Sequence, residues 1–142
     1  MTALVDTCVI IDALSNRAPF SEAAQELLLR GSERSVSLFV SAKTFLDTHY
    51  VLKHYLHDES LVRAKLSDLL SAVEIADTRG SSCAVALTSP TTDYEDAVQI
   101  ETALSQGIDC IVTRDSSGFS HSPIPAMDAR SFLQRMDKGD AF

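Results

Sequence analysis

Short runs of apolar residues alternate in this chain with longer segments whose apolar positions recur every three to four residues. The short runs are typical of buried strands, and the longer segments have the spacing of helices that cover a core. The predicted strands are residues 3–5, 36–40, 73–75, 109–112 and 126–127. The predicted helices are residues 7–14, 21–31, 41–57, 59–71, 82–87, 93–107 and 129–136, with Ser21 as the N-cap and Gly31 as the end of the second of them. This alternation predicts an α/β fold with three α/β/α layers around a parallel sheet.

One domain is expected to contain residues 1–142. This length is usual for a single domain, and 45% apolar residues suffice for a core without disulfides. No repeat, low-complexity tract or linker-like stretch divides the sequence. No apolar run approaches the roughly 20 residues that cross a bilayer, and the N-terminus lacks the basic region of a signal peptide. We therefore expect no membrane association.

The three cysteines, Cys8, Cys83 and Cys110, are widely spaced, and none belongs to a Cys-x-x-Cys pair. An odd, scattered set is typical of small buried side chains in a reducing compartment, rather than of a disulfide framework or a zinc site. The cysteines therefore indicate a cytoplasmic protein.

The formal net charge of −8 argues against a protein that binds nucleic acid through bulk electrostatics, because such domains are usually basic. The charge is compatible with a nuclease that uses bound divalent cations, provided that the acidic side chains converge. In open parallel sheets, ligands bind outside the carboxyl ends of the strands. The acids near those ends are therefore the candidates.

Two aspartates follow predicted strands. Asp6 ends the first strand directly, and Asp115 leaves the fourth strand after two intervening residues. Aspartate is also a favourable helix N-cap, and this alternative stays open for Asp6. Because both strands end at the same edge of the sheet, we expect the two carboxylates to lie side by side there. Gly118 would let the following loop pass close to this edge.

Further acids occur at helix starts. Asp93 and Asp96 open a predicted helix and occupy neighbouring positions on one face. Asp93 is the natural N-cap, with a ligand role as the alternative, whereas Asp96 borders the apolar stripe and is expected to point into the fold. Glu95 is expected to point away as a solvated charge. Asp47 lies among apolar residues, so it is either a surface acid or a buried one that needs a partner or a metal.

Several other charged and imidazole groups fit ordinary surface positions. Asp12, Asp58 and Glu59 are expected to be solvated charges. His54 and His57 have the spacing of one helix face, but no third ligand is near them in the sequence. Histidines at a helix end are common and favoured by the helix dipole, so a metal site there is not expected.

Three motifs along the chain resemble, in kind and in order, those of the PIN domain. The PIN domain is the nuclease fold of VapC-type toxins in toxin–antitoxin pairs. Residues 4–10, LVDTCVI, match the opening motif of a strand followed by Asp and Thr. Residues 93–99, DYEDAVQ, are similar to the DxxDA start of a helix. Residues 111–115, IVTRD, followed by Gly118 and Phe119, match the closing TxD…F motif. The resemblance covers nearly the whole chain, and the set is more specific than any one motif.

The resemblance implies that Asp6, Asp96 and Asp115 are catalytic acids at a metal site and that Thr113 is an active-site hydroxyl. The family usually has Glu in the third helix, where this chain has Asp47. The shorter side chain affects the second metal position, so Asp47 would act at a weakly held ion or through water.

The chemistry that follows is hydrolysis of RNA phosphodiester bonds with Mg²⁺ or Mn²⁺. Several carboxylates without a catalytic histidine suit these hard cations, which prefer oxygen ligands. Such ions activate water, stabilise charge on the leaving oxygen and screen the acids from an approaching phosphate. Lys43, Arg79 and Arg114 are candidate contacts to the RNA backbone. We therefore expect a metal-dependent ribonuclease.

Two other classes remain open. A phosphatase with Asp6 as nucleophile would need a second acid two residues later, where the chain has Cys8. A catalytically inactive binding module would keep the fold but cleave nothing. The resemblance also implies a small antitoxin protein as partner, and hence a toxin role, with a homodimer as an open alternative for the assembly.

Overall fold

A five-stranded parallel sheet forms the centre of the protein in the computed structural model, which describes residues 1–140. The strands are β1 (Thr2–Val5), β2 (Ser37–Ser41), β3 (Glu74–Ala76), β4 (Cys110–Val112) and β5 (Ala126–Met127). Their order is β3-β2-β1-β4-β5, and every neighbouring pair is parallel. Because the strand order reverses at β1, this topology favours a binding site at the carboxyl ends of β1 and β4.

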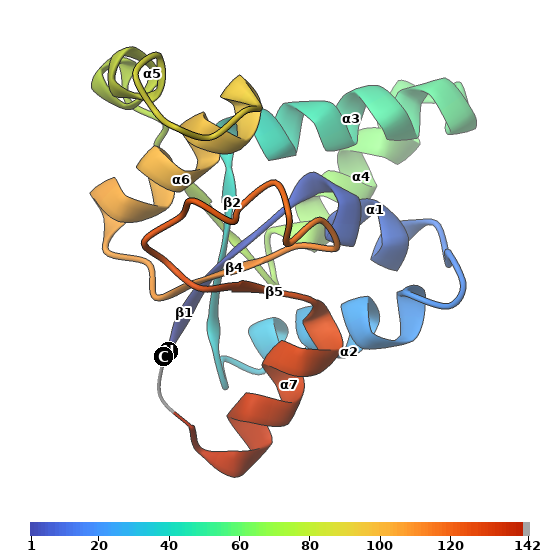
Figure 1. Cartoon of the computed structure of the whole chain (residues 1–142). Helices are drawn as coiled ribbons and strands as arrows, with labels where there is room; N and C mark the ends of the chain where they lie inside the picture. Colours follow the sequence, from blue (N-terminus) through green and yellow to red (C-terminus); the bar gives the residue numbers. More distant parts are fainter. Residues whose placement is uncertain (141–142) are drawn as a thin grey trace.

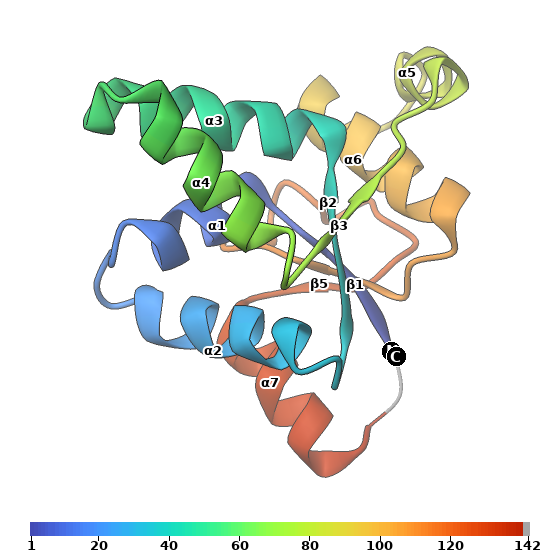
Figure 2. The same ribbon diagram turned by 180° about the vertical axis from the view of Figure 1, so that it is seen from behind.

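Seven helices flank the sheet within the described residues. They are α1 (Thr7–Leu14), α2 (Ser21–Ser32), α3 (Ala42–Leu56), α4 (Glu59–Leu69), α5 (Gly80–Ala86), α6 (Tyr94–Gln106) and α7 (Ala129–Lys138). Helices α1, α2, α4 and α7 cover one face of the sheet, and α6 covers the other (Figures 1 and 2). Helix α5 packs on α6. The predicted α/β fold, with three layers around a parallel sheet, is therefore confirmed.

The central strand is buried on both faces because its side chains alternate between them. Ala3 and Val5 belong to the larger core, together with Phe132 of α7. Leu4 points the other way, into a smaller cluster with Ile100 of α6. Burial of one such leucine or isoleucine side chain contributes about 1.5–3 kcal/mol. The carboxyl end of β1 is therefore fixed between two packed layers.

Helix α2 differs from its prediction at both ends. Ser21 was the expected N-cap, but it is the first helical residue, and Phe20 occupies the cap position without a side-chain hydrogen bond. Gly31 was expected to end the helix, but the helix continues to Ser32. A Cβ atom at Gly31 would lie 2.3 Å from the carbonyl oxygen of Ala72. This glycine therefore permits a close approach between two segments and does not act as a helix stop.

The other predicted elements are all present, with ends displaced by at most two residues. Asp93 caps α6 as predicted, and its carboxylate accepts hydrogen bonds from the backbone N–H groups of Glu95 and Asp96. No helix in residues 1–140 is long and apolar enough to span a membrane.

Candidate functional site

The carboxyl ends of β1 and β4 bring Asp6, Thr113 and Asp115 together. The backbone N–H of Asp6 donates to the carbonyl oxygen of Val112 over 2.9 Å, which continues the pairing of the two strands. The fully buried Thr113 hydroxyl donates to Asp6 Oδ2 over 2.8 Å and accepts a 3.0 Å hydrogen bond from the Asp115 N–H. One hydroxyl thus links the two aspartates that the sequence places at this edge.

The Asp6 carboxylate receives four hydrogen bonds. Its Oδ1 accepts from the Thr7 N–H at 2.6 Å and from Gln99 Nε2 at 2.9 Å. Its Oδ2 accepts from the Thr113 hydroxyl and, at 3.3 Å, from the Cys8 thiol. Asp6 is also the N-cap of α1. The capping role and a role at this edge are therefore compatible, and the four donors fix the orientation of the carboxylate.

Asp96 and Asp115 converge on Gly118. A Cβ atom at Gly118 would lie 2.5 Å from Asp96 Oδ2 and 3.4 Å from Asp115 Oδ2. Asp115 Oδ1 accepts hydrogen bonds from the Ser117 hydroxyl and from the Gly118 N–H, which hold the pKa of Asp115 below its ordinary value. The glycine expected to pass close to this edge does so, and only a residue without a side chain leaves room for both carboxylates.

Charge accumulates around Asp96. Burial and the negative charges of Asp93, Asp6, Asp115 and Glu95 together raise the pKa of Asp96 to about 6, and burial is the largest cause. A carboxyl group whose ionised form is disfavoured by several neighbouring carboxylates would gain from a nearby cation.

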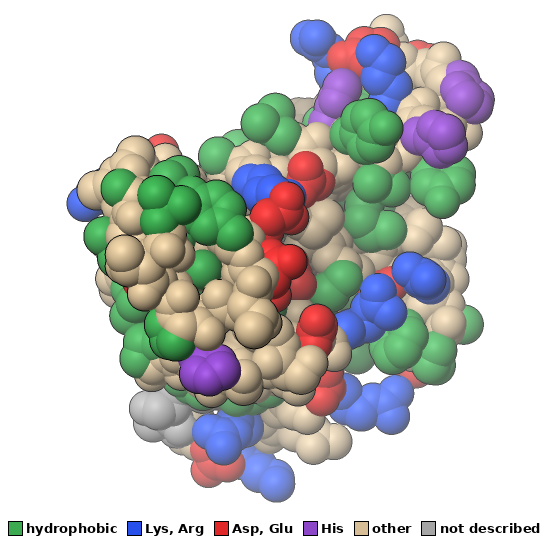
Figure 3. All heavy atoms as spheres, turned by 45° about the horizontal axis from the view of Figure 1, so that its top comes forward, with side chains coloured by type: hydrophobic (Ala, Val, Ile, Leu, Met, Phe, Trp, Pro, Cys, Tyr) green, Lys and Arg blue, Asp and Glu red, His purple; other side chains and the backbone are tan. Residues whose placement is uncertain are grey.

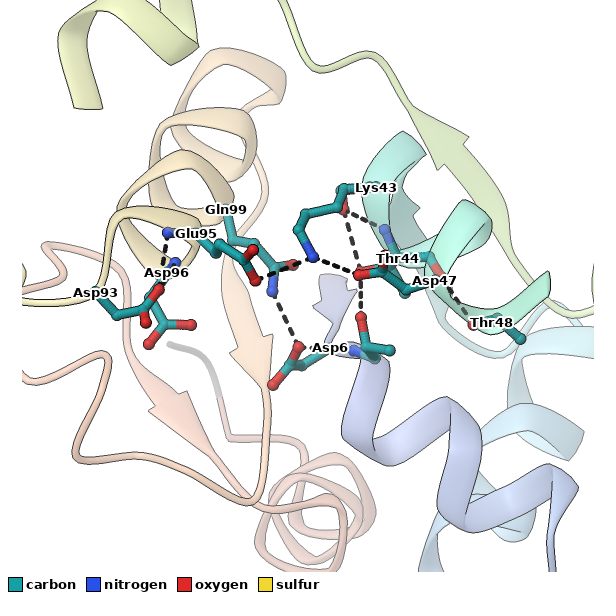
Figure 4. A network of polar contacts seen from close by, with 11 residues as sticks. Asp6, Lys43, Thr44, Asp47, Thr48, Asp93, Glu95, Asp96 and Gln99 are labelled. Atoms are coloured by element: carbon teal, nitrogen blue, oxygen red, sulfur yellow. Dashed lines mark hydrogen bonds and ion pairs between the residues drawn. The ribbon is translucent and has the colours of Figure 1, made fainter. Parts of the chain in front are cut away.

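Asp47 lines the same cavity as Asp6 and Asp96, and it pairs with Lys43. Lys43 Nζ forms an ion pair with Asp47 Oδ2 and another, at 3.1 Å, with Glu95 Oε2 (Figure 4). Burial lowers the pKa of Lys43, but its hydrogen bonds to the two carboxylates and their charges hold it above its ordinary value. Glu95 is largely solvated, as expected, because its side chain is 66% exposed. However, the expectation that it points away from the site is wrong. Its long side chain reaches Lys43 across the cavity.

These side chains line a cavity of about 420 Å³. Four carboxylates contribute to its wall: Asp6, Asp47, Glu95 and Asp96. Its basic residues are Arg17, Lys43 and Arg114. Figure 3 shows acidic side chains in a line across a hollow of this face. Of the predicted RNA-backbone contacts, Lys43 and Arg114 line this cavity, whereas Arg79 is the N-cap residue of α5.

The expectation that Asp12 is a solvated charge is wrong. Asp12 is only 1% exposed, and Arg114 Nε lies 2.7 Å from its Oδ2 atom. Neither Asp12 oxygen has a hydrogen bond of good geometry, so the contact is an ion pair. The Arg114 guanidinium also lies 4.6 Å from the centroid of the Phe20 ring. Arg114 borders a second cavity, of about 440 Å³, which lies outside the acidic cluster.

Two acids that were expected to be solvated charges, Asp58 and Glu59, have structural roles. Asp58 is the N-cap of α4, through a 3.1 Å hydrogen bond from the Leu61 N–H. Glu59 is more than a solvated charge, because it pairs with His49, Lys53 and Arg63. Its hydrogen bonds with Arg63, His49 and Lys53 lower the pKa of Glu59 to about 2.

The donor atoms at the cavity fit a hard divalent cation. The acids supply only oxygen ligands, which Mg²⁺ and Mn²⁺ prefer. The side-chain oxygen of Gln99, Oε1, is buried and has no hydrogen-bond partner within the described residues. However, no three His, Cys, Asp or Glu side chains in residues 1–140 are arranged as a ready metal site, His54 and His57 included. Because hydrogen bonds fix the Asp6 carboxylate, Asp96 and Asp115 would have to turn toward it before the three acids could share an ion.

Gln99 is the site residue that the sequence interpretation missed. It follows Asp96 by three residues, so both lie on the same face of α6. A side-chain amide on the same helix face as a predicted site acid was the signal that could have identified it. The structure adds that Gln99 orients Asp6 through its side-chain N–H group.

Comparison with known proteins agrees with this architecture. A family model described as a PIN domain matches residues 2–117. One similar solved structure is VapBC2 from Rickettsia felis, bound to a DNA fragment from its promoter. Its TM-score is 0.64 at 17% identity, and the match covers 90% of this chain and 98% of that chain. A toxin–antitoxin complex from Klebsiella pneumoniae has a TM-score of 0.63 at 25% identity and covers 85% of this chain and 92% of that chain.

A third similar structure is VapC20 from Mycobacterium tuberculosis, a toxin that cleaves the sarcin–ricin loop. Its TM-score is 0.62 at 14% identity, and the match covers 82% of this chain and 92% of that chain. No curated protein matches the chain. At identities of 14% and 17%, the likeness to the Mycobacterium and Rickettsia structures shows a common fold.

Proposed function

Because this chain belongs to the PIN domain family, we propose that it is a ribonuclease that hydrolyses RNA phosphodiester bonds with Mg²⁺ or Mn²⁺. The observation that carries the proposal is the convergence of acids from three separate segments. Asp6 follows β1, Asp96 lies on α6, and Asp115 follows β4. A buried hydroxyl connects Asp6 with Asp115, and a glycine leaves room for Asp96 beside Asp115.

The proposed ligands are Asp6, Asp96 and Asp115, and Asp93 and Asp47 are candidates of lower rank. Asp93 already caps α6, and Asp47 already pairs with Lys43. A bound divalent ion supplies Lewis acidity and a more acidic water for attack on phosphorus.

The surrounding residues orient the acids. The Thr113 hydroxyl and the Gln99 amide hold the two oxygens of Asp6. Arg114, fixed by Asp12 and Phe20, presents positive charge to the cavity that an RNA phosphate would approach. Positioning of this kind reduces the entropy lost when the reacting groups are brought together.

A phosphatase that uses Asp6 as nucleophile is less well supported. Both oxygens of Asp6 are engaged by hydrogen-bond donors, and position 8 carries a thiol that donates to Asp6. Burial and the charge of Asp6 raise the pKa of Cys8, so this thiol is a poor replacement for a catalytic acid at neutral pH.

The proposed partner is a small antitoxin protein. The Rickettsia felis and Klebsiella pneumoniae structures are described as VapBC2 and as a toxin–antitoxin complex. By analogy, we infer that an antitoxin covers the acidic cavity and places a basic side chain among the carboxylates. The protein would then act as a cytoplasmic toxin, and its expression alone should slow growth until a neighbouring gene restores it.

Cleavage of RNA by the purified full chain tests the function. Activity should be lost in the presence of a chelator and return when Mg²⁺ or Mn²⁺ is added in excess. Activity that persists in the chelator would exclude metal dependence. Specific Mn²⁺ binding without cleavage of any RNA would indicate an inactive binding module instead.

A further inference from the structure

Lys43 connects the two helices that border the acidic cavity. It lies in the first turn of α3, one turn before Asp47, and Glu95 lies in the first turn of α6. Figure 4 shows the Lys43 side chain between Asp47 and Glu95. The ammonium group forms an ion pair with each of the two carboxylates, and all three side chains line the cavity.

The acids of the site therefore fall into two groups that differ in charge compensation. Asp47 and Glu95 share the Lys43 ammonium. Asp6, Asp96 and Asp115 have no ion pair with a basic residue in the part of the chain that the structure describes. The uncompensated charge is concentrated at the β1 and β4 edge.

A simple surface ion pair is the alternative explanation for Lys43, since i,i+4 pairs are common on exposed helix faces. One observation argues against it. Lys43 pairs with acids from two different helices, and all three side chains line the cavity. An i,i+4 pair on one helix face accounts for the contact with Asp47 but not for the contact with Glu95 on α6.

We propose that the Lys43 ammonium takes the place of a second cation on the Asp47 side of the cavity. The site then binds one divalent ion, among Asp6, Asp96 and Asp115. Lys43 supplies the remaining positive charge that an RNA phosphate meets between α3 and α6. This inference rests on the proposed metal-dependent nuclease function. The Lys43 ammonium would repel a divalent ion beside Asp47 at short range. The Asp47 carboxylate is also already paired with that ammonium and is therefore not free to bind an ion.

The number of Mn²⁺ ions bound per chain tests the proposal without relying on activity. Isothermal titration of the purified full chain should give one ion for the wild type. Lys43→Met removes the charge but keeps most of the side-chain length, so it should give two ions, the second bound more weakly. Lys43→Arg keeps the charge and should still give one ion. Adding Asp47→Asn to Lys43→Met should return the number to one.

Lys53→Met is the matched control. Lys53 also lies on α3 and pairs with an acid, Glu59, but it lies outside the cavity lining. This variant should bind one ion. Thermal unfolding of each variant shows whether it is folded. Glu95→Gln is a second, milder change, because it removes one partner of Lys43 but keeps the ammonium group beside Asp47. This variant should still bind one ion.

Two results would overturn the proposal while leaving the proposed function intact. One is a wild type that binds two Mn²⁺ ions. The other is a folded Lys43→Met variant that still binds one. A wild type that binds no Mn²⁺ and cleaves no RNA would instead overturn the proposed function, and this inference with it. At a Mn²⁺ concentration that fills only the first site, Lys43→Met should also cleave RNA about 10²-fold more slowly than the wild type, the size typical of losing one charge-stabilising group.

Discussion

The hydroxyl of Thr113 donates a hydrogen bond to the Asp6 carboxylate over 2.8 Å, although the two residues are 107 positions apart in the sequence. This contact joins the carboxyl ends of β1 and β4, the two strands on which the proposed site depends. The hydroxyl oxygen of Thr113 also accepts a hydrogen bond from the Asp115 N–H. A single buried side chain therefore contacts two of the proposed ligands and, with the pairing of β1 and β4, holds them side by side.

Thr113→Val tests this role, because valine has the shape of threonine without the hydroxyl. The Asp115 N–H loses its acceptor and Asp6 loses a donor. Loss of a partner for a buried polar group costs about 1–3 kcal/mol. We expect the free energy of unfolding in urea to fall by that amount and RNA cleavage to fall by about 10–100-fold. Thr113→Ser keeps the hydroxyl and should therefore retain most of the stability and most of the RNA cleavage. Equal activity in Thr113→Val and wild type would remove Thr113 from the site.

Gly118→Ala should impair the site more than the fold. The added Cβ atom would approach Asp96 Oδ2 to 2.5 Å, which forces this carboxylate to move. RNA cleavage and Mn²⁺ affinity should both decrease, while the unfolding midpoint changes little. Gly80→Ala is the matched control, because a Cβ atom there has no neighbour within 4 Å. If Gly118→Ala behaves like Gly80→Ala in both assays, Asp96 does not need its present position.

Asp96→Asn should stabilise the metal-free protein at neutral and alkaline pH. The pKa of Asp96 is raised to about 6 in the folded protein, against about 3.9 in an unfolded chain. The folded state then holds the proton more tightly, so the contribution of Asp96 to stability falls as pH rises from about 4 to 6 and stays low above that. The amide cannot ionise and removes this loss.

Unfolding of Asp96→Asn and wild type between pH 4 and pH 8 in a chelator measures this effect. The difference in unfolding free energy should grow with pH, in favour of the variant, and level off above pH 6. Added Mg²⁺ should stabilise the wild type more than the variant. A difference that is constant with pH would show that Asp96 is not crowded by its acidic neighbours.

The ion pair of Asp12 with Arg114 should respond unequally to removal of its two members. Arg114→Ala leaves the buried Asp12 carboxylate without a partner, which costs roughly 3–5 kcal/mol. Asp12→Asn leaves an arginine that is 29% exposed and can turn toward water, so its cost should be smaller. Urea unfolding of both variants and of the double variant measures the two costs and their coupling. Equal costs would mean that Asp12 finds solvent or another partner.

The sequence was sufficient for the strands, the parallel sheet and the positions of Asp6 and Asp115, because these follow from strand ends and apolar runs. It was insufficient for Asp12, whose partner Arg114 is distant in the sequence and is brought to it only by packing of the loop after β4. Helix spacing also misplaced Glu95. A fixed angle per residue describes where the Cα–Cβ bond points, but not how far a flexible side chain reaches toward Lys43.

The central claim is that the Asp6, Asp96 and Asp115 cluster carries out metal-dependent RNA cleavage. The most direct measurement is the single-turnover cleavage rate of one RNA, at saturating Mn²⁺, for the wild type, Asp6→Asn and Asp96→Asn, purified identically. Asp68→Asn, at an exposed aspartate of α4, is the matched control for loss of a carboxylate. We expect cleavage by the wild type and Asp68→Asn, and none above background for folded Asp6→Asn and Asp96→Asn. Wild-type rates in either of these two variants would contradict it.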